Sequence, residues 1–129
     1  MIYPTHHMYS SFKPEDLMAV LEGISDAVVK LDADSNYIAM NGAAAEVFRR
    51  LGREPQQMLG KSVWELFPGV KGTIVEQKLR EVLEHDVHIE YDFFYPVDQR
   101  WYQGRGYPSM KGAILIFRDI TQRKATQSG

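Results

Sequence analysis

The sequence predicts an α+β domain in which one five-stranded antiparallel sheet carries helices mainly on one face. Three observations lead to this expectation. Strand-like segments occur in the first third and again in the last third of the chain, the residues between them have helical periodicity, and short turns connect the strands within each group. The 129 residues have the length of a single domain.

The chain begins with a segment that we expect to be a mobile lead, residues 1–13. Pro14 suits the first turn of a helix, in which Leu17 and Leu21 recur at helical spacing. Gly23 is expected to end this helix. The pattern therefore predicts an N-terminal amphipathic helix ahead of the sheet.

Two short strands and a helix are expected next. Residues 27–31 and 37–40 have the composition of strands, and the polar residues between them favour a turn. The Asn41 side chain can accept a hydrogen bond from a backbone amide at the start of the following helix. The apolar residues of that helix fall at helical spacing: Ala44, Val47, Phe48 and Leu51.

The middle of the chain is expected to be helical. Residues 60–68 combine a glycine, a short helical turn and an aromatic-proline stop. Residues 73–85 contain the clearest helix of the sequence, with one apolar stripe that includes Ile74, Val75, Leu79, Val82 and Leu83. We expect this helix to lie across the sheet.

Three strands are expected to complete the sheet. Residues 87–95 alternate between apolar and polar side chains, residues 100–108 are rich in aromatic side chains, and residues 113–117 are uniformly apolar. The uniformly apolar strand is predicted to lie in the interior of the sheet with both of its faces covered.

The end of the chain resembles the final hairpin of PAS domains, the sensory modules of histidine kinases and cyclic-di-nucleotide enzymes. The resemblance rests on Arg100-Trp101-Tyr102, Tyr107-Pro108-Ser109 and Phe117-Arg118-Asp119-Ile120-Thr121, and it covers roughly residues 15–124. It implies a non-catalytic sensory domain over residues 14–121 and a linker or signalling helix that starts in residues 122–129. It also implies that Asp119 and Thr121 transmit the signal, with Asp119 accepting hydrogen bonds and Thr121 capping the next helix.

The resemblance places a ligand pocket between the sheet and the helices. Gly104 and Gly106 are predicted to face the helices, where their missing side chains leave room for a ligand, unless Phe93, Tyr91 or Trp64 fills that space. The aromatic and Met residues at helical spacing are equally consistent with an ordinary core. The candidate pocket residues are Phe48, Met58, Trp64, Phe67, Ile74, Leu79, Tyr91, Phe93, Tyr102, Gly104 and Gly106.

Dimerisation is the second expectation that comes with the resemblance. The helix residues Leu17 and Leu21, together with Trp101 and Tyr107 on the other face of the sheet, are candidates for the contact between two copies. A downstream effector domain, such as a histidine kinase or a diguanylate cyclase, would be the second partner.

Composition and charge restrict the ligands and partners. The chain contains no cysteine, which excludes a disulfide, a thiolate metal site and cysteine-linked flavin chemistry. Residues 73–84 contain no histidine, so haem would require a departure from the family pattern. The net charge of −2 indicates neither nucleic acid nor an anionic membrane as a partner. We expect a cytoplasmic module without a signal peptide or membrane span. The identity of any cofactor stays open.

Three further interpretations stay open. His85, Asp86 and His88 resemble a group of metal ligands, but they fall at a helix-to-strand junction where a surface turn has the same composition. A small stand-alone enzyme would use His85 or His88 with Glu90 or Asp92 for acid-base chemistry. A PAS domain with a filled core would act as a ligand-free dimerisation scaffold.

Overall fold

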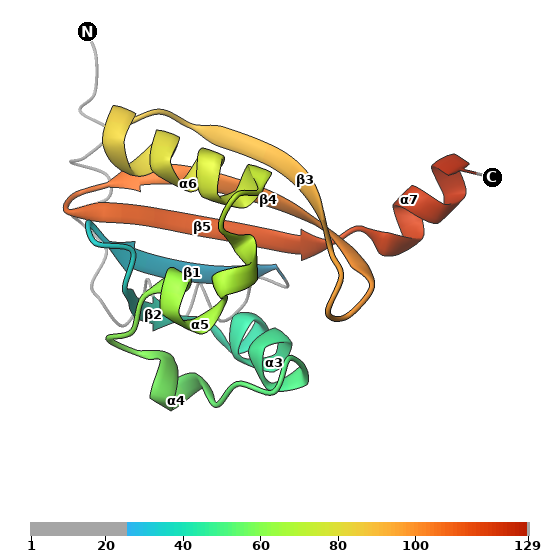
Figure 1. Cartoon of the computed structure of the whole chain (residues 1–129), viewed down its shortest axis with the longest axis horizontal. Helices are drawn as coiled ribbons and strands as arrows, with labels where there is room; N and C mark the ends of the chain where they lie inside the picture. Colours follow the sequence, from blue (N-terminus) through green and yellow to red (C-terminus); the bar gives the residue numbers. More distant parts are fainter. Residues whose placement is uncertain (1–25, 129) are drawn as a thin grey trace, which may run out of the picture.

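The computed structural model describes residues 26–128 of the chain (Figure 1). Its sheet has five antiparallel strands in the order β2-β1-β5-β4-β3. Their bounds are β1 Ala27–Asp32, β2 Tyr37–Met40, β3 Ile89–Tyr95, β4 Arg100–Ser109 and β5 Gly112–Asp119. The predicted fold class and the central position of the uniformly apolar strand are confirmed.

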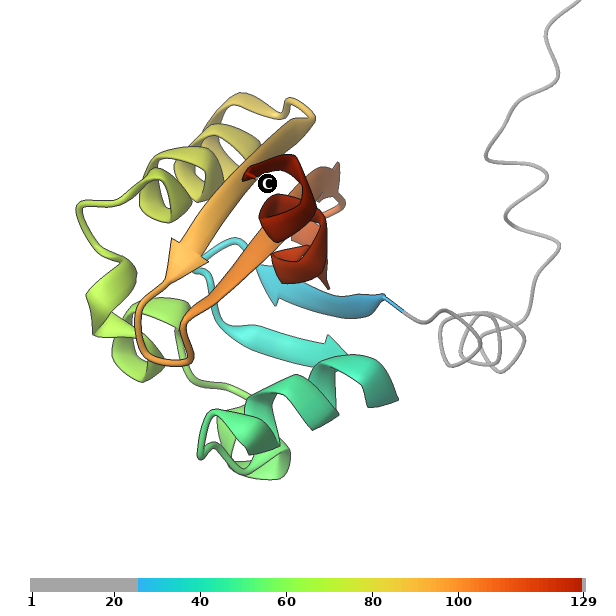
Figure 2. The same ribbon diagram turned by 90° about the vertical axis from the view of Figure 1, so that its right-hand side faces the viewer.

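The helices between β2 and β3 lie together on one face of the sheet (Figure 2). The helix α6, which is predicted to lie across the sheet, packs on β3, β4 and β5. The helices of this layer are α3 Gly42–Arg50, α4 Pro55–Met58, α5 Val63–Leu66 and α6 Ile74–His85, with a 3-10 turn at Pro68–Val70. The sequence did not predict α4, because four residues are too few to show helical periodicity.

Side-chain caps begin three of these helices, and at the start of α5 the Ser62 hydroxyl accepts from the Glu65 amide at 3.0 Å. The Asn41 side chain accepts hydrogen bonds from the amides of Ala44 and Val28, each at 3.0 Å. Thr73 caps α6 by accepting from the amide of Val75. Asn41 therefore has the capping role that the sequence predicts, and it also ties α3 to the start of β1.

The β2 edge of the sheet is protected by the segment before α5. The Tyr37 amide donates to the Lys61 carbonyl at 3.0 Å, and the Gly60 amide donates to the Tyr37 carbonyl at 2.8 Å. These bonds satisfy backbone groups of an edge strand that would otherwise be available to another chain. They also hold the Tyr37 backbone next to the helical layer.

Burial of the central strand differs from the prediction. Of the residues in β5, Ala113 is fully buried, whereas Ile114 and Ile116 on one face and Leu115 and Phe117 on the other are half-buried. The described helices cover one face, and a cavity on that face exposes part of Leu115 and Phe117. The expectation that both faces of this strand are covered is therefore wrong for the described residues.

The last helix, α7 (Thr121–Ser128), projects beyond the end of the sheet (Figure 1). The predicted N-terminal lead and amphipathic helix, with the dimer candidates Leu17 and Leu21, lie outside the described residues. Among residues 26–128, no helix combines the length and the apolar composition that crossing a bilayer requires.

Candidate ligand cavity and C-terminal joint

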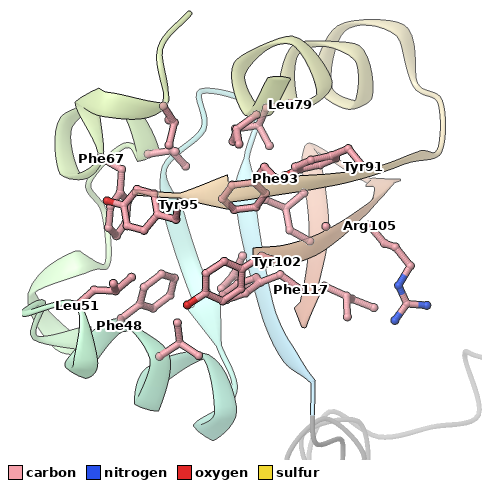
Figure 3. Close-up of a pocket in the computed structure, with 18 of the residues that line it drawn as sticks. Phe48, Leu51, Phe67, Leu79, Tyr91, Phe93, Tyr95, Tyr102, Arg105 and Phe117 are labelled. Atoms are coloured by element: carbon pink, nitrogen blue, oxygen red, sulfur yellow. The ribbon is translucent and has the colours of Figure 1, made fainter. Parts of the chain in front are cut away.

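A cavity of about 110 Å³ lies between the sheet and the helical layer (Figure 3). All five strands and the helices α3, α5 and α6 contribute to its wall. The side chains around it are almost all aliphatic or aromatic. The lining residues are Val29, Tyr37, Val47, Phe48, Leu51, Val63, Phe67, Val70, Val75, Leu79, Tyr91, Phe93, Tyr95, Tyr102, Gly104, Arg105, Leu115, Ile116 and Phe117.

Most of the candidate pocket residues lie along this cavity. They are Phe48, Phe67, Leu79, Tyr91, Phe93, Tyr102 and Gly104. The helical phase explains Leu79, which follows the buried Val75 by four residues on the inner side of α6. Strand alternation explains Tyr91 and Phe93, which point toward the helices from β3 (Figure 3).

Four candidates do not line this cavity. Ile74 is 37% exposed because the buried stripe of α6 runs through Val75 instead. Trp64 faces Arg80 on another side of the helical layer, with the guanidinium carbon 5.8 Å from the ring centre. Met58 is packed in the core away from the cavity, and Gly106 is covered by another side chain.

The space above the two glycines is filled by protein. Gly104 and Gly106 face the helices as predicted, and both are buried. An added Cβ atom would lie 2.6 Å from Tyr91 Cζ at position 104 and 2.6 Å from Ile89 Cγ1 at position 106. Tyr91 and Ile89 are the cross-strand partners of these glycines. The glycines therefore make room for neighbouring side chains rather than directly for a ligand.

Tyrosines that the sequence analysis did not select also line the cavity. Tyr37 is 5% exposed, and burial together with the neighbouring Tyr91 and Tyr95 phenols raises its pKa. Burial raises the pKa of Tyr91 to about 12. Tyr95 continues the alternation of Tyr91 and Phe93, which was the sequence signal for it. Tyr37 has no comparable signal, because its neighbours in space come from distant strands.

Tyr102 connects the cavity to the β3–β4 turn. Its hydroxyl donates a hydrogen bond to the Asp98 carboxylate. Burial and this hydrogen bond raise the pKa of Tyr102. Its ring stacks on Phe93, with 5.6 Å between ring centres. The Tyr102 hydroxyl therefore donates its hydrogen bond within the protein.

A group of hydrogen bonds holds the junction between β5 and α7. Asp119 Oδ1 accepts from the Thr121 amide at 2.9 Å, and Asp119 Oδ2 accepts from Arg100 at 2.7 Å. Burial opposes ionisation of Asp119, but the hydrogen bonds from Thr121 and Arg100 outweigh it and lower the pKa of this carboxyl. Asp119 thus accepts hydrogen bonds in the way that the resemblance implies.

Thr121 has a different role from the cap that the resemblance implies. Its hydroxyl oxygen accepts from the amide of Trp101 at 2.9 Å, and the Ile120 amide donates to the Trp101 carbonyl at 2.8 Å. Thr121 therefore fastens the start of α7 to β4, while the Asp119 carboxylate bonds the first amide of the helix.

The predicted dimer residues of the sheet, Trp101 and Tyr107, are half-buried on the face away from the cavity. Trp101 lies between Phe94, at 5.7 Å between ring centres, and Lys124 of α7, whose Nζ is 4.7 Å from the ring centre. The Tyr107 ring meets His88 edge-on at 4.4 Å. Neighbouring side chains therefore cover part of each aromatic surface.

The residues of the enzyme hypothesis do not gather around the cavity. His88 packs against Tyr107 on the opposite face, Glu90 accepts from Gln103, and Asp92 pairs with Lys124. None of these residues lines the cavity. In the described part of the chain, no three histidine, aspartate or glutamate side chains come close enough together to hold a metal ion.

Comparison with family models decides the relationship. A model of the PAS fold matches residues 21–125, which include the whole sheet, the cavity and the start of α7. The chain belongs to the PAS family. PAS domains are generally non-catalytic sensory modules. Comparison with curated proteins gave no match.

Solved structures share this PAS fold. The PAS domain of a protein from Colwellia psychrerythraea has a TM-score of 0.62 and 24% identity, with 84% of this chain and 98% of that chain covered. The photoactive yellow protein domain of the sensor histidine kinase Ppr from Rhodospirillum centenum has a TM-score of 0.63 and 16% identity, with 86% and 96% covered. The sensor region of a sensor histidine kinase has a TM-score of 0.62 and 18% identity, with 77% and 40% covered. The chain is thus a PAS sensory domain similar in fold to those of sensor histidine kinases.

Proposed function

We propose that this PAS domain is a non-catalytic module that binds a small molecule in its cavity and passes the signal through α7 to an effector domain. The PAS unit spans residues 14–121, and residues 122–129 begin the connection to the effector. A histidine kinase or a diguanylate cyclase is the proposed effector. The module acts as a cytoplasmic homodimer, whose contacts include Leu17, Leu21, Trp101 and Tyr107.

One observation carries the proposal: adjacent residues of β4 contact the cavity and the signalling joint. Tyr102 lines the cavity, whereas the backbone of Trp101 bonds to both Thr121 and Ile120. A change in the position of Tyr102 therefore acts on the first turn of α7 through one peptide unit. Coupling between the cavity and α7 therefore requires a shift of only β4 and of the helix attached to it.

The context of similar structures supports a signalling role. Two of the solved PAS structures described above come from sensor histidine kinases. The charged residues Asp98 and Arg105 near the cavity are paired within the protein, with Tyr102 and Asp26 respectively. An apolar cavity without a free acid-base pair suits binding better than catalysis.

Native mass spectrometry of the purified full chain tests the proposal. We expect a complex of two chains together with bound small molecules, which denaturing extraction then releases for identification. Leu79→Phe fills part of the cavity and is expected to remove the bound molecule while the fold is retained, as checked by circular dichroism. Leu59→Phe is the matched control, because Leu59 is 48% exposed and lies outside the cavity wall.

The same experiment separates the remaining interpretations. A dimer without any extractable molecule, even from freshly lysed cells, would favour the ligand-free scaffold. A bound molecule that is chemically converted on incubation would favour the enzyme hypothesis. Equal occupancy in the Leu79→Phe and Leu59→Phe variants would mean that the molecule binds outside the cavity.

A further inference from the structure

The cavity wall contains tyrosine hydroxyls that have no protein partner. Among the described residues, the side-chain hydroxyls of Tyr37, Tyr91 and Tyr95 form no hydrogen bond, whereas Tyr102 donates to Asp98. Tyr37 is only 5% exposed. A buried hydroxyl is usually paired, because removing it from water without a partner is unfavourable. The molecule that occupies the cavity, either water or a ligand, can supply that partner.

These phenols lie close together on the wall. All three residues line the cavity, and the Tyr91 and Tyr95 phenols contribute, after burial, to the raised pKa of Tyr37. Figure 3 shows Tyr91 and Tyr95 extending from β3 toward the helical side of the cavity. Phenols that stay protonated keep an O–H group available to donate. The wall therefore offers donors to an acceptor atom inside the cavity.

The interior offers no charged group to an ionised ligand. Arg105 is the one charged residue among those that line the cavity, and Figure 3 shows its side chain pointing away from the cavity. Its guanidinium pairs with Asp26 at 3.3 Å, on the far side of the sheet. Burying an ion without a counter-charge is strongly unfavourable. The cavity therefore selects an uncharged occupant.

The volume limits the size of that occupant. The cavity measures about 110 Å³. A protein cavity of about 150 Å³ holds benzene. A molecule of about six non-hydrogen atoms is thus close in size to what the wall surrounds.

We infer that the cavity binds a small uncharged molecule, of about the size of a five- or six-membered ring, whose carbonyl oxygen accepts a hydrogen bond from Tyr37. The apolar part of the molecule contacts the aliphatic and aromatic wall. This inference rests on the proposed function, because it names the chemical class of the ligand for the same cavity. The inference also assigns to Tyr37 the hydrogen bond to the carbonyl oxygen of the ligand.

Three probes of six non-hydrogen atoms each test the chemical class. Cyclopentanone carries the acceptor, methylenecyclopentane has nearly the same shape without it, and cyclopropanecarboxylate is charged. Each is titrated into the ¹⁵N-labelled full chain, and binding is followed by amide chemical shifts. We expect the ketone to bind about fivefold more tightly than the alkene, which corresponds to one net hydrogen bond, and the carboxylate to bind most weakly.

Single-atom variants test the role of Tyr37. Tyr37→Phe removes only the hydroxyl and is expected to make the ketone and the alkene bind equally. Tyr107→Phe makes the same chemical change on the other face of the sheet and is expected to keep the preference. A second measurement on the unaltered chain is the carbonyl ¹³C resonance of the bound ketone, which moves downfield on accepting a hydrogen bond. It remains informative if Tyr37→Phe unfolds.

Three outcomes would overturn the inference. Equal binding of ketone and alkene to the unaltered chain would mean that no donor is used. Tightest binding of the carboxylate would mean that the ligand is charged. No binding of any probe would mean that the cavity holds only water or a molecule of another size. In each case, the proposed function is judged separately, by the dimer and the extracted molecule in native mass spectrometry.

Discussion

The Lys124 ammonium lies 3.0 Å from the Asp92 carboxylate, which ties the first turns of α7 to the edge strand β3. The same ammonium lies over the Trp101 ring at 4.7 Å. These contacts and the Thr121 hydrogen bond fix α7 at two points on the sheet. The direction of α7 as it leaves the domain depends on both points.

Replacing Lys124 with glutamine is expected to loosen α7 without unfolding the sheet. The loss combines a half-exposed ion pair and one cation–π contact, so we expect about 0.5–1 kcal/mol of local destabilisation. In a Trp64→Phe background, Trp101 is the remaining tryptophan, and its fluorescence is expected to shift to longer wavelength as the ring becomes exposed. Arg123→Gln removes the same charge from the neighbouring position and is the control. Equal shifts in both variants would contradict the docking role of Lys124.

Replacing Thr121 with alanine is expected to release the Trp101 amide. That amide donates to the Thr121 hydroxyl at 2.9 Å, and one such bond contributes about 1 kcal/mol. Hydrogen exchange of the Trp101 amide should accelerate about fivefold. Thr121→Ser should restore slow exchange, and Thr126→Ala, which removes a hydroxyl further along α7, should leave it unchanged. Fast exchange in the serine variant would show that the methyl group, not the hydroxyl, holds the joint.

Adding a methyl group at Gly104 is expected to reduce the cavity. The new Cβ atom would meet the far end of Tyr91 at 2.6 Å, and this phenol end can turn toward the cavity. We expect Gly104→Ala to weaken cyclopentanone binding and to cost about 1–3 kcal/mol of stability from overpacking. Val82→Ala changes a buried residue outside the cavity wall and is the control for stability alone. Equal weakening of binding in both variants would mean that a general loss of packing is responsible.

The buried phenols are expected to limit stability at alkaline pH. Burial raises the pKa of Tyr91 to about 12 and also raises that of Tyr37. The folded state favours the neutral phenols. Their contribution to the free energy of unfolding is therefore complete below about pH 10, the pKa of an unperturbed tyrosine. It is lost as the pH rises through the folded-state pKa. Tyrosinate absorbance should therefore rise together with loss of circular dichroism, and Tyr91→Phe should move this transition to higher pH. An unchanged transition in Tyr91→Phe would contradict the prediction.

Local patterns in the sequence predicted the elements because each pattern reflects forces between near neighbours. Alternation predicted β3, helical spacing predicted α6, and the position of Asn41 predicted its cap. The same reasoning assigned Leu79 and Phe93 to the side of the sheet where the cavity lies. It failed for Ile74, because the pattern left the phase of the buried stripe uncertain by one residue.

By itself, the sequence determined the antiparallel sheet, its central strand and the polar joint that leads into α7. Only the tertiary structure decided which side chains meet across the cavity, such as Tyr37 from β2 and Tyr91 from β3. It also decided that Tyr91 occupies the space above Gly104. The physical reason is that periodicity reports which face a residue is on, whereas the volume of a cavity depends on how closely side chains from distant segments pack there.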